Sequence, residues 1–133
     1  MKIISTISDK KPQNNYLKIG NNTIYFEIAD NPYKKMKGLS DRKYLKEESG
    51  MLFIYQKAAQ YPFWMKDMHF NLDFIFIYND KIVDLKENIP CPENNQPPQT
   101  VNSSKSFDKL LEVNAGTIKK LNIKKGQKVS FTF

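Results

Sequence analysis

The apolar residues of this chain fall in short runs of strand length, and turn-forming residues separate these runs. Ile24, Phe26 and Ile28 alternate with more polar residues, which is the period-two pattern of a half-buried β-strand. The longest apolar stretch, Phe74–Tyr78, is also strand-sized and falls far short of the roughly 18 residues that a membrane-spanning helix needs. Aromatic residues, which favour strands, make up 13% of the chain. The pattern therefore predicts a β-rich protein without a transmembrane segment.

The length of 133 residues fits a single domain that can bury a core without disulfide or metal staples. We interpret the polar residues 1–15 as a flexible or short-strand lead-in, with the strand at Lys2–Ile7, and residues 16–133 as one β-rich domain. The apolar stretch at the N-terminus is too short for the core of a signal peptide, so we expect no signal peptide in this chain.

Turn residues mark the expected strand boundaries. The pair Asn79-Asp80 fits a tight two-residue hairpin loop, because both residue types accept positive φ. Pro62 makes Tyr61–Met68 an edge strand or a bulged segment. The most apolar segment, Leu72–Tyr78, is expected to be a central strand. The other expected strands are Tyr16–Ile19, Thr23–Ala29, Met51–Tyr55, Lys81–Leu85, Phe107–Val113 and Lys128–Phe133.

Two short segments carry helix signals. Asp30 or Asn31 can cap a helix that begins at Pro32 and ends before Gly38. A single helical turn is expected at residues 117–121, with Thr117 as its cap. Residues 88–106 contain four prolines and are expected to form a long loop. Together these elements predict a mainly β fold: a single compact β-sandwich or roll with two short helices.

The net charge of +7 would suit nucleic acid or another anionic surface. Lysines and acidic residues alternate along the chain instead of forming long basic blocks, which is typical of a solvated surface. We therefore do not expect nucleic acid as the partner. The single cysteine, Cys91, and the single histidine, His69, cannot form an internal disulfide or a Cys/His zinc set, so we expect no metal and no cofactor.

Several motifs occur in a fixed order along the chain. They are Lys37-Gly38-Leu39-Ser40-Asp41-Arg42, Gly50-Met51-Leu52-Phe53, Phe63-Trp64-Met65-Lys66-Asp67-Met68, Leu72-Asp73, Leu111-Glu112-Val113 and Lys125-Gly126-Gln127-Lys128-Val129. This series resembles the pattern of the bacterial and archaeal family called domain of unknown function 192, over about residues 24–133. The resemblance implies a compact, mainly β, sandwich-like fold and frequent export to the cell envelope. It does not bring a known activity.

The chain departs from the family pattern at a few positions. Ser40 stands where the family usually has Met, Asp67 and Met68 replace Asn and Thr, and Gln127 replaces Asp. Many relatives carry two cysteines in the long loop, where this chain has Cys91 alone. The resemblance therefore does not imply a loop disulfide here.

The segment 63–73 contains the highest concentration of side chains that could bind a ligand or take part in catalysis. In an extended strand, Trp64, Lys66 and Met68 would share one face. A tryptophan beside a lysine can stack a sugar or base and hold an acidic group. The alternative is structural: Trp64 covers the core with Lys66 lying over it, and Asp67 and Asp73 accept hydrogen bonds from turn amides.

An enzymatic alternative rests on Asp67, His69 and Asp73, where an imidazole beside carboxylates could act as a general base in a hydrolase or lyase. No activated nucleophile stands nearby in the sequence, so we assign no catalytic residue.

Arg42 and Glu112 are further candidates for binding. Arg42 could hold an anionic ligand as a planar fork, or it could fix a loop by pairing with a carboxylate. An ion pair between Arg42 and Glu112, or between Lys66 and Asp73, is compatible with the sequence, which does not place these side chains relative to one another.

The sequence therefore favours a monomeric, non-catalytic module that binds an unknown small ligand or protein partner. The family resemblance adds association with the cell envelope. The alternatives are a hydrolase or lyase and a basic nucleic-acid-binding domain. The candidate ligand-binding residues are Trp64, Lys66, Asp67, Asp73, Arg42 and Glu112.

Overall fold

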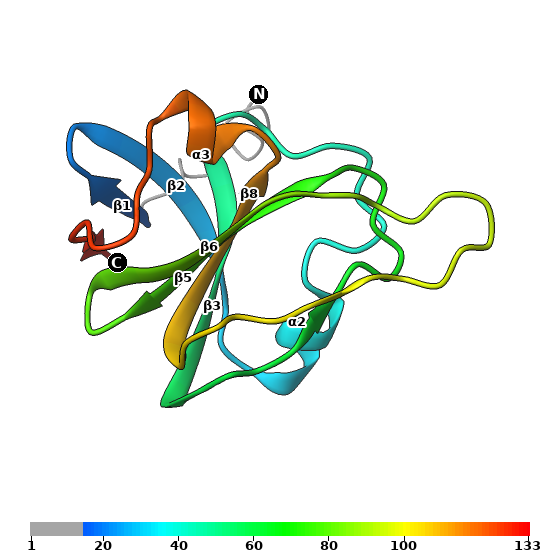
Figure 1. Cartoon of the computed structure of the whole chain (residues 1–133), viewed down its shortest axis with the longest axis horizontal. Helices are drawn as coiled ribbons and strands as arrows, with labels where there is room; N and C mark the ends of the chain where they lie inside the picture. Colours follow the sequence, from blue (N-terminus) through cyan, green and yellow to red (C-terminus); the bar gives the residue numbers. More distant parts are fainter. Residues whose placement is uncertain (1–14) are drawn as a thin grey trace, which may run out of the picture.

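The computed structural model describes residues 15–133, and the strand predicted at Lys2–Ile7 lies outside them. The strands of the main sheet are β1 (Tyr16–Ile19), β2 (Asn22–Ala29), β3 (Ser49–Ala59), β5 (Leu72–Tyr78), β6 (Lys81–Ile89), β8 (Phe107–Asn114) and β9 (Ser130–Thr132). They lie in the order β6-β5-β8-β3-β2-β1-β9 and curl into a half-barrel (Figure 1). Neighbouring strands are antiparallel except for β2 and β3, which run parallel.

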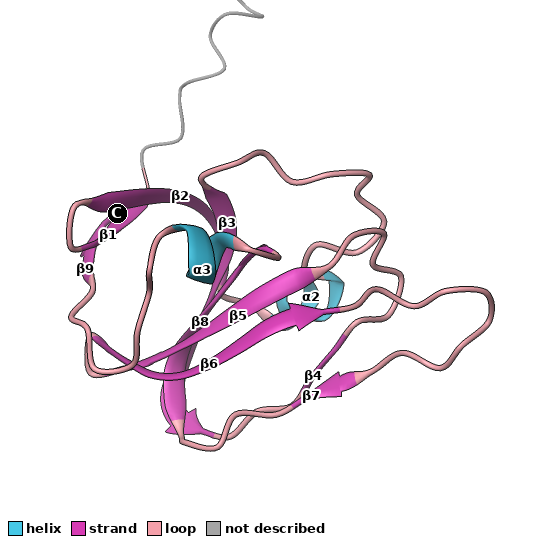
Figure 2. Ribbon diagram, turned by 45° about the horizontal axis from the view of Figure 1, so that its top comes forward, coloured by secondary structure: helices cyan, strands magenta, loops and turns pink. Residues whose placement is uncertain are grey.

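A second, two-stranded sheet pairs β4 (Phe63–Trp64) with β7 (Thr100–Val101) (Figure 2). The helices are α2 (Pro32–Lys37) and α3 (Thr117–Lys120). Residues 15–133 thus have the mainly β fold with two short helices that the sequence predicts, and the curled sheet makes it a roll. In this part of the chain no helix is long and apolar enough to cross a membrane.

Apolar side chains are buried on both faces of the main sheet. On β8, Leu110 packs in one cluster and Leu111 in the other, and Phe74 and Ile75 on β5 divide in the same way. Side chains of α3 complete the cluster that holds Leu111, while the β4–β7 sheet and residues 65–68 complete the other. Because both faces of β5 are covered, its sequence is a continuous apolar run instead of an alternating one.

Several predicted strands differ from the structure. Strands β3 and β6 are longer than the predicted Met51–Tyr55 and Lys81–Leu85, and β7 lies within the segment 88–106 that is predicted to be a loop. The predicted central strand β5 lies second from one edge, and β3 occupies the middle of the sheet. The strand predicted at Tyr61–Met68 is reduced to β4, because the chain turns directly after it. Met68 N donates a hydrogen bond to Met65 O (3.2 Å), and Asp67 has a φ of 59°. The last strand, β9, is shorter than predicted.

Helix α2 is capped as predicted, and α3 is not. Asn31 Oδ1 accepts a hydrogen bond from Lys34 N (2.9 Å), and Gly38 N donates to Lys34 O (2.8 Å) at the other end. At α3 the N-cap position belongs to Gly116, with a φ of 96°, and the predicted cap at Thr117 is wrong. The Thr117 hydroxyl instead donates to a carbonyl oxygen that precedes the helix.

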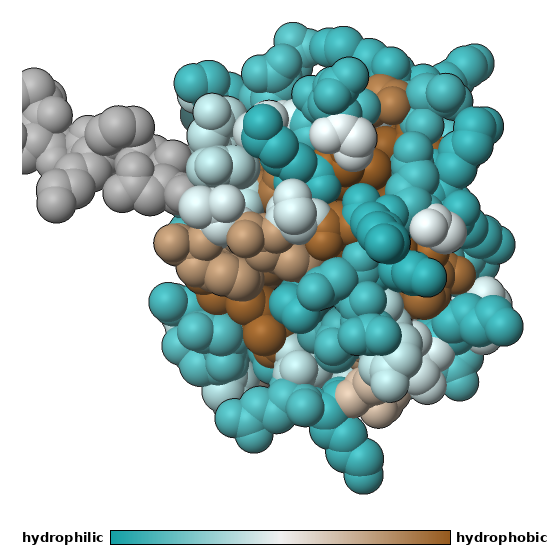
Figure 3. All heavy atoms as spheres, turned by 90° about the vertical axis from the view of Figure 1, so that its left-hand side faces the viewer, coloured by the Kyte–Doolittle hydropathy of each residue, from teal (hydrophilic) through white to brown (hydrophobic). Residues whose placement is uncertain are grey.

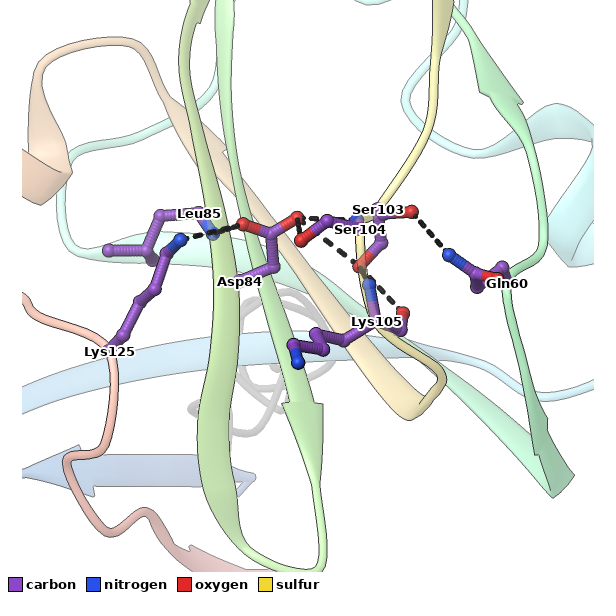
Figure 4. Close-up of polar contacts among 7 residues, drawn as sticks. All are labelled: Gln60, Asp84, Leu85, Ser103, Ser104, Lys105 and Lys125. Carbon is purple, nitrogen blue, oxygen red and sulfur yellow. Dashed lines mark hydrogen bonds and ion pairs between the residues drawn. The ribbon is translucent and has the colours of Figure 1, made fainter.

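The long loop after β6 is fixed to the sheet at Asp84, a buried residue on β6 (Figure 4). Its carboxylate accepts hydrogen bonds from Leu85 N (2.9 Å), Ser104 N (2.7 Å) and Ser104 Oγ (3.0 Å), and Lys125 Nζ lies 3.4 Å away. Burial alone would raise the pKa of Asp84, but these contacts together lower it. Ser104 follows β7 closely in the chain, so these contacts fix the segment after β7 to β6.

An apolar strip crosses an otherwise hydrophilic surface where β1, β2 and β9 lie (Figure 3). Close to the edge strand β9, the rings of Phe131 and Phe133 stack with centroids 5.9 Å apart. Both rings also contact the edge or face of Phe26, at 6.4 Å and 5.8 Å between centroids. The core of the half-barrel therefore continues to the surface at this edge.

Candidate functional site

Two motif segments that are distant in the sequence lie against each other. Ser40 Oγ donates a hydrogen bond to Lys66 O (3.1 Å), and Asp41 N donates to Asp67 O (2.8 Å). His69 Nε2 lies 3.9 Å from Asp41 Oδ1. These contacts fix the loop after α2 against the turn after β4, and a recess opens beside them.

The recess has a volume of ≈ 250 Å³ and lies between α2, β3, β4 and β8. Aromatic side chains form much of its wall, and charged side chains of both signs line it. The residues that matter for its chemistry are Lys35, Lys37, Phe53, Tyr55, Phe63, Trp64 and Glu112. Among the described residues that line the recess, Glu112 is the only acid.

Glu112 lies on the internal strand β8 and is 5% exposed. Its cross-strand neighbours, Met51 on β3 and Phe74 on β5, are buried and apolar. In the part of the chain that the structure describes, no hydrogen-bond or ion-pair partner reaches its carboxyl group. Burial raises the pKa of Glu112 to about 8, because an apolar environment disfavours the charged form. At neutral pH the group is therefore mostly protonated.

Tyr55 lies on the same wall as Glu112. Burial, with smaller contributions from the charges of Glu112 and Tyr61, raises the pKa of Tyr55 to about 12. Its ring stacks on Tyr61 with centroids 3.9 Å apart, and Lys35 Nζ lies 3.9 Å from the Tyr55 centroid. The ring is thus held rigidly, with a cation over it.

Trp64 is 52% exposed, and its ring lines the recess. The buried position next to it belongs to Met65, which is 0% exposed. Lys66 Nζ lies 5.2 Å from the Trp64 ring centroid, as expected for neighbours on one side of the chain. Met68 does not share their exposed face but is buried in the core, because the turn at Asp67 reverses the chain.

Asp67, His69 and Asp73 do not converge. The Asp73 carboxylate is fully buried on the sheet face opposite the recess, where it accepts hydrogen bonds from the backbone amides of Asn88 (2.8 Å), Gly116 (3.0 Å) and Ile118 (2.9 Å). Asp67 and His69 are exposed. The structural interpretation of Asp73 is therefore confirmed, and the geometry offers no site for the hydrolase or lyase alternative at these three residues.

Arg42 forms a two-pronged ion pair with Glu27, at 2.6 Å and 2.9 Å. The Arg42 guanidinium lowers the pKa of Glu27 mainly through these hydrogen bonds. The alternative pairs Arg42–Glu112 and Lys66–Asp73 do not form, because Arg42 is engaged elsewhere and Asp73 is saturated by amides. A wider hollow of ≈ 440 Å³ borders the Arg42–Glu27 pair. The charges of Arg42 and Glu27 neutralise each other, so this pair does not call for a charged ligand there.

Sequence reasoning identified Trp64 and Glu112 but missed Lys35 and Tyr55. The alternation of Phe53 and Tyr55 places these two aromatic side chains on one strand face, which could have indicated Tyr55. Nothing in the sequence brings Lys35 to that face, since α2 and β3 meet only in the fold. Within residues 15–133 no group of three His, Cys, Asp or Glu side chains could hold a metal ion.

The chain matches the model of the family DUF192, described as Uncharacterized ACR, over residues 15–131. A solved structure from Sinorhizobium meliloti 1021, described as a candidate transcription regulator, is 27% identical. It has a TM-score of 0.77 and covers 88% of this chain and 91% of its own. A protein of unknown function from Novosphingobium aromaticivorans DSM 12444 is 26% identical, with a TM-score of 0.72, over 87% of this chain and 82% of its own. No curated protein gives a significant match.

The family match spans nearly the whole chain and agrees with the motifs that meet around the recess. The protein therefore belongs to the uncharacterised family DUF192.

Proposed function

We propose that the protein is a non-catalytic domain that binds a small molecule in the recess between α2, β3, β4 and β8. The observation that carries the proposal is the carboxyl group of Glu112, which is buried without a partner among residues 15–133 and lines that recess. A buried polar group without a hydrogen bond destabilises the fold. A ligand that supplies the missing bond would offset this cost.

The walls of the recess support the same proposal. Binding sites for small molecules are concave, largely apolar, and carry a few convergent polar groups. The rings of Tyr55, Phe63 and Trp64 provide the apolar surface, and Glu112 with Lys35 provides the polar groups. The exposed Trp64 ring at this recess is the feature that separates a binding module from a purely structural tryptophan.

The test is a thermal-shift screen with sugars, polyols, amines, carboxylic acids and amino acids. A compound that binds the native state raises the melting temperature by mass action. We expect at least one class to raise it in the wild type and to lose the effect in Trp64→Ala. Tyr78→Ala is the matched control, because Tyr78 is 48% exposed and does not line the recess.

Two results would overturn the proposal. In the first, no compound in the screen shifts the melting temperature of the wild type. In the second, the shifts persist in Trp64→Ala and in Glu112→Gln, which would place binding elsewhere.

A second candidate is nucleic-acid binding, because one solved relative is described as a candidate transcription regulator. Lys18, Lys81 and Lys128 surround a hollow of ≈ 460 Å³ away from the recess, and the net charge is +7. Binding of this kind weakens steeply as salt rises. Fluorescence anisotropy with labelled duplex DNA at low and moderate salt tests it, and no binding at low salt rejects it. Association with the cell envelope and a monomeric state stay predictions.

A further inference from the structure

We infer that the recess takes a small zwitterion of amino-acid size, with its ammonium group against Glu112 and its acidic group at Lys35 and Lys37. This inference rests on the proposed function and names the class of ligand. It follows from the charges of both signs that line the recess, from its aromatic wall, and from its volume.

The inner end of the recess favours a cation. The Glu112 carboxyl is 5% exposed and has apolar cross-strand neighbours, so a partner must come from the recess itself. Hydrogen bonds between ionised groups are about twice as strong as those between neutral groups, and an ammonium group can donate three of them. An amine therefore satisfies this carboxylate better than a hydroxyl group does.

The aromatic wall favours a cation as well. Ring faces attract positive charge through their quadrupoles. Two of these rings already face protein cations, with Lys35 Nζ 3.9 Å from the Tyr55 centroid and Lys66 Nζ 5.2 Å from the Trp64 centroid. The recess thus combines one carboxyl group with an aromatic wall that accommodates positive charge, since protein cations already lie against two of its rings.

The lysines of α2 exclude a ligand that is only a cation. Lys35 is half-buried and Lys37 is exposed, and both line the recess. Lys37 has only a weak, exposed partner, since its Nζ lies 4.0 Å from Asp41 Oδ2. A simple amine would meet these two charges and the overall charge of +7. An acidic group on the ligand turns this repulsion into attraction.

The volume limits the size of the ligand. At ≈ 250 Å³ the recess is smaller than the pockets of about 300–1,000 Å³ that hold drug-sized molecules. A free amino acid or a compound of similar size fits this limit.

The inference requires binding to depend on pH. The titratable groups that line the recess with Glu112 are Tyr55 from β3 and Lys35 and Lys37 from α2; the lining residues from β4 and β5 do not titrate. An ammonium group binds the ionised carboxylate, so binding releases the proton that Glu112 holds at neutral pH. Affinity should therefore rise about tenfold per pH unit below a pH of about 8 and then level off.

The experiment uses the fluorescence of Trp64, which is the only tryptophan in the chain and lines the recess. The full-length protein is titrated with free amino acids, with their N-acetyl derivatives, with their methyl esters, and with neutral sugars. We expect free amino acids to change the fluorescence with the stated pH dependence. The N-acetyl compounds, which lack the ammonium group, and the esters, which lack the acid, should bind at least tenfold more weakly.

Two variants test the assigned contacts. Glu112→Gln, which keeps the shape of the side chain, should lose the pH dependence and bind amino acids at least tenfold more weakly. Glu87→Gln, at an exposed position on β6, is the control and should bind like the wild type.

The outcomes separate this inference from the proposed function. If neutral sugars or simple acids bind in a Trp64-dependent way and amino acids do not, the recess is a binding site and the assigned ligand class is wrong. If N-acetyl amino acids bind as well as free ones, the contact with Glu112 is wrong. If no compound changes the fluorescence or the melting temperature, both proposals fail.

Discussion

The carboxylate of Asp73 on β5 accepts a hydrogen bond from the backbone amide of Ile118 at the start of α3, at 2.9 Å. The same carboxylate accepts bonds from Gly116 N and Asn88 N. One buried side chain therefore joins a strand, a helix start and the end of β6. It does for α3 what a capping side chain within the helix would otherwise do.

Asp73→Ala should destabilise the protein by about 3 kcal/mol or more, because it leaves three backbone amides without their acceptor. Urea denaturation of the variant beside the wild type measures the effect. Asp30→Ala removes an exposed aspartate and serves as the control. A loss for Asp73→Ala no larger than that for Asp30→Ala would show that water replaces the carboxylate at little cost.

Gly50→Ala should be more damaging than Gly20→Ala. A Cβ atom on Gly50 would lie 2.6 Å from Glu112 O and 3.0 Å from Val113 Cγ1, so β3 and β8 would have to separate. We expect a loss of about 3 kcal/mol from this overpacking. Gly20 has a φ of +62° and open space around it, so alanine there should cost about 1 kcal/mol through backbone strain alone. Thermal and urea unfolding measure the stability of both variants. Equal losses of stability would contradict the close approach of Gly50 to β8.

Glu112 should make the protein less stable as pH rises. Its pKa is about 8 in the folded state against an ordinary value of 4.5, so the folded state binds the proton more tightly. Stability from this group is full below about pH 4.5 and falls by about 1.4 kcal/mol per pH unit up to about pH 8.

Glu112→Gln removes this slope. The variant should match the wild type near pH 5 and exceed its stability near pH 8, whereas Glu87→Gln should follow the wild type throughout. Urea denaturation at the two pH values makes the comparison. Parallel curves for Glu112→Gln and the wild type would mean that the carboxyl group is not buried as described.

Asp84 should make the protein less stable as pH falls, which is opposite to the effect of Glu112. Its pKa is lowered in the folded state, so its contribution is present above the ordinary pKa and is lost as pH falls through the folded value. Asp84→Asn should cost about 1–3 kcal/mol at neutral pH, and this difference should shrink in acid. Asp80→Asn, in the exposed hairpin, is the control. A constant difference across the pH range would rule out the ionised anchor.

The candidate site could be predicted from the sequence only in part. Trp64 and Glu112 stand out because a tryptophan next to a lysine and an acid within an apolar strand are local features. Their partners are not local. The loop after α2 reaches the turn after β4 through hydrogen bonds between residues 26 positions apart, and no periodicity encodes such a contact. Whether the Trp64 ring is accessible stayed open for the same reason, since the turn at Asp67 depends on what it packs against.

The sequence by itself determined the position of most strands of the main sheet, the turns and the helix α2, because these depend on alternation, on Gly and Asn at positive φ, and on caps within a few residues. It also determined the family, through motifs that are read in order. Only the tertiary structure decided that one sheet would be buried on both faces. The tertiary structure also decided that Asp73 accepts hydrogen bonds from backbone amides on one face of the sheet. On the other face, Glu112 has no partner among residues 15–133. Both are acids on apolar strands, and which amides or cavities they meet depends on how distant segments pack.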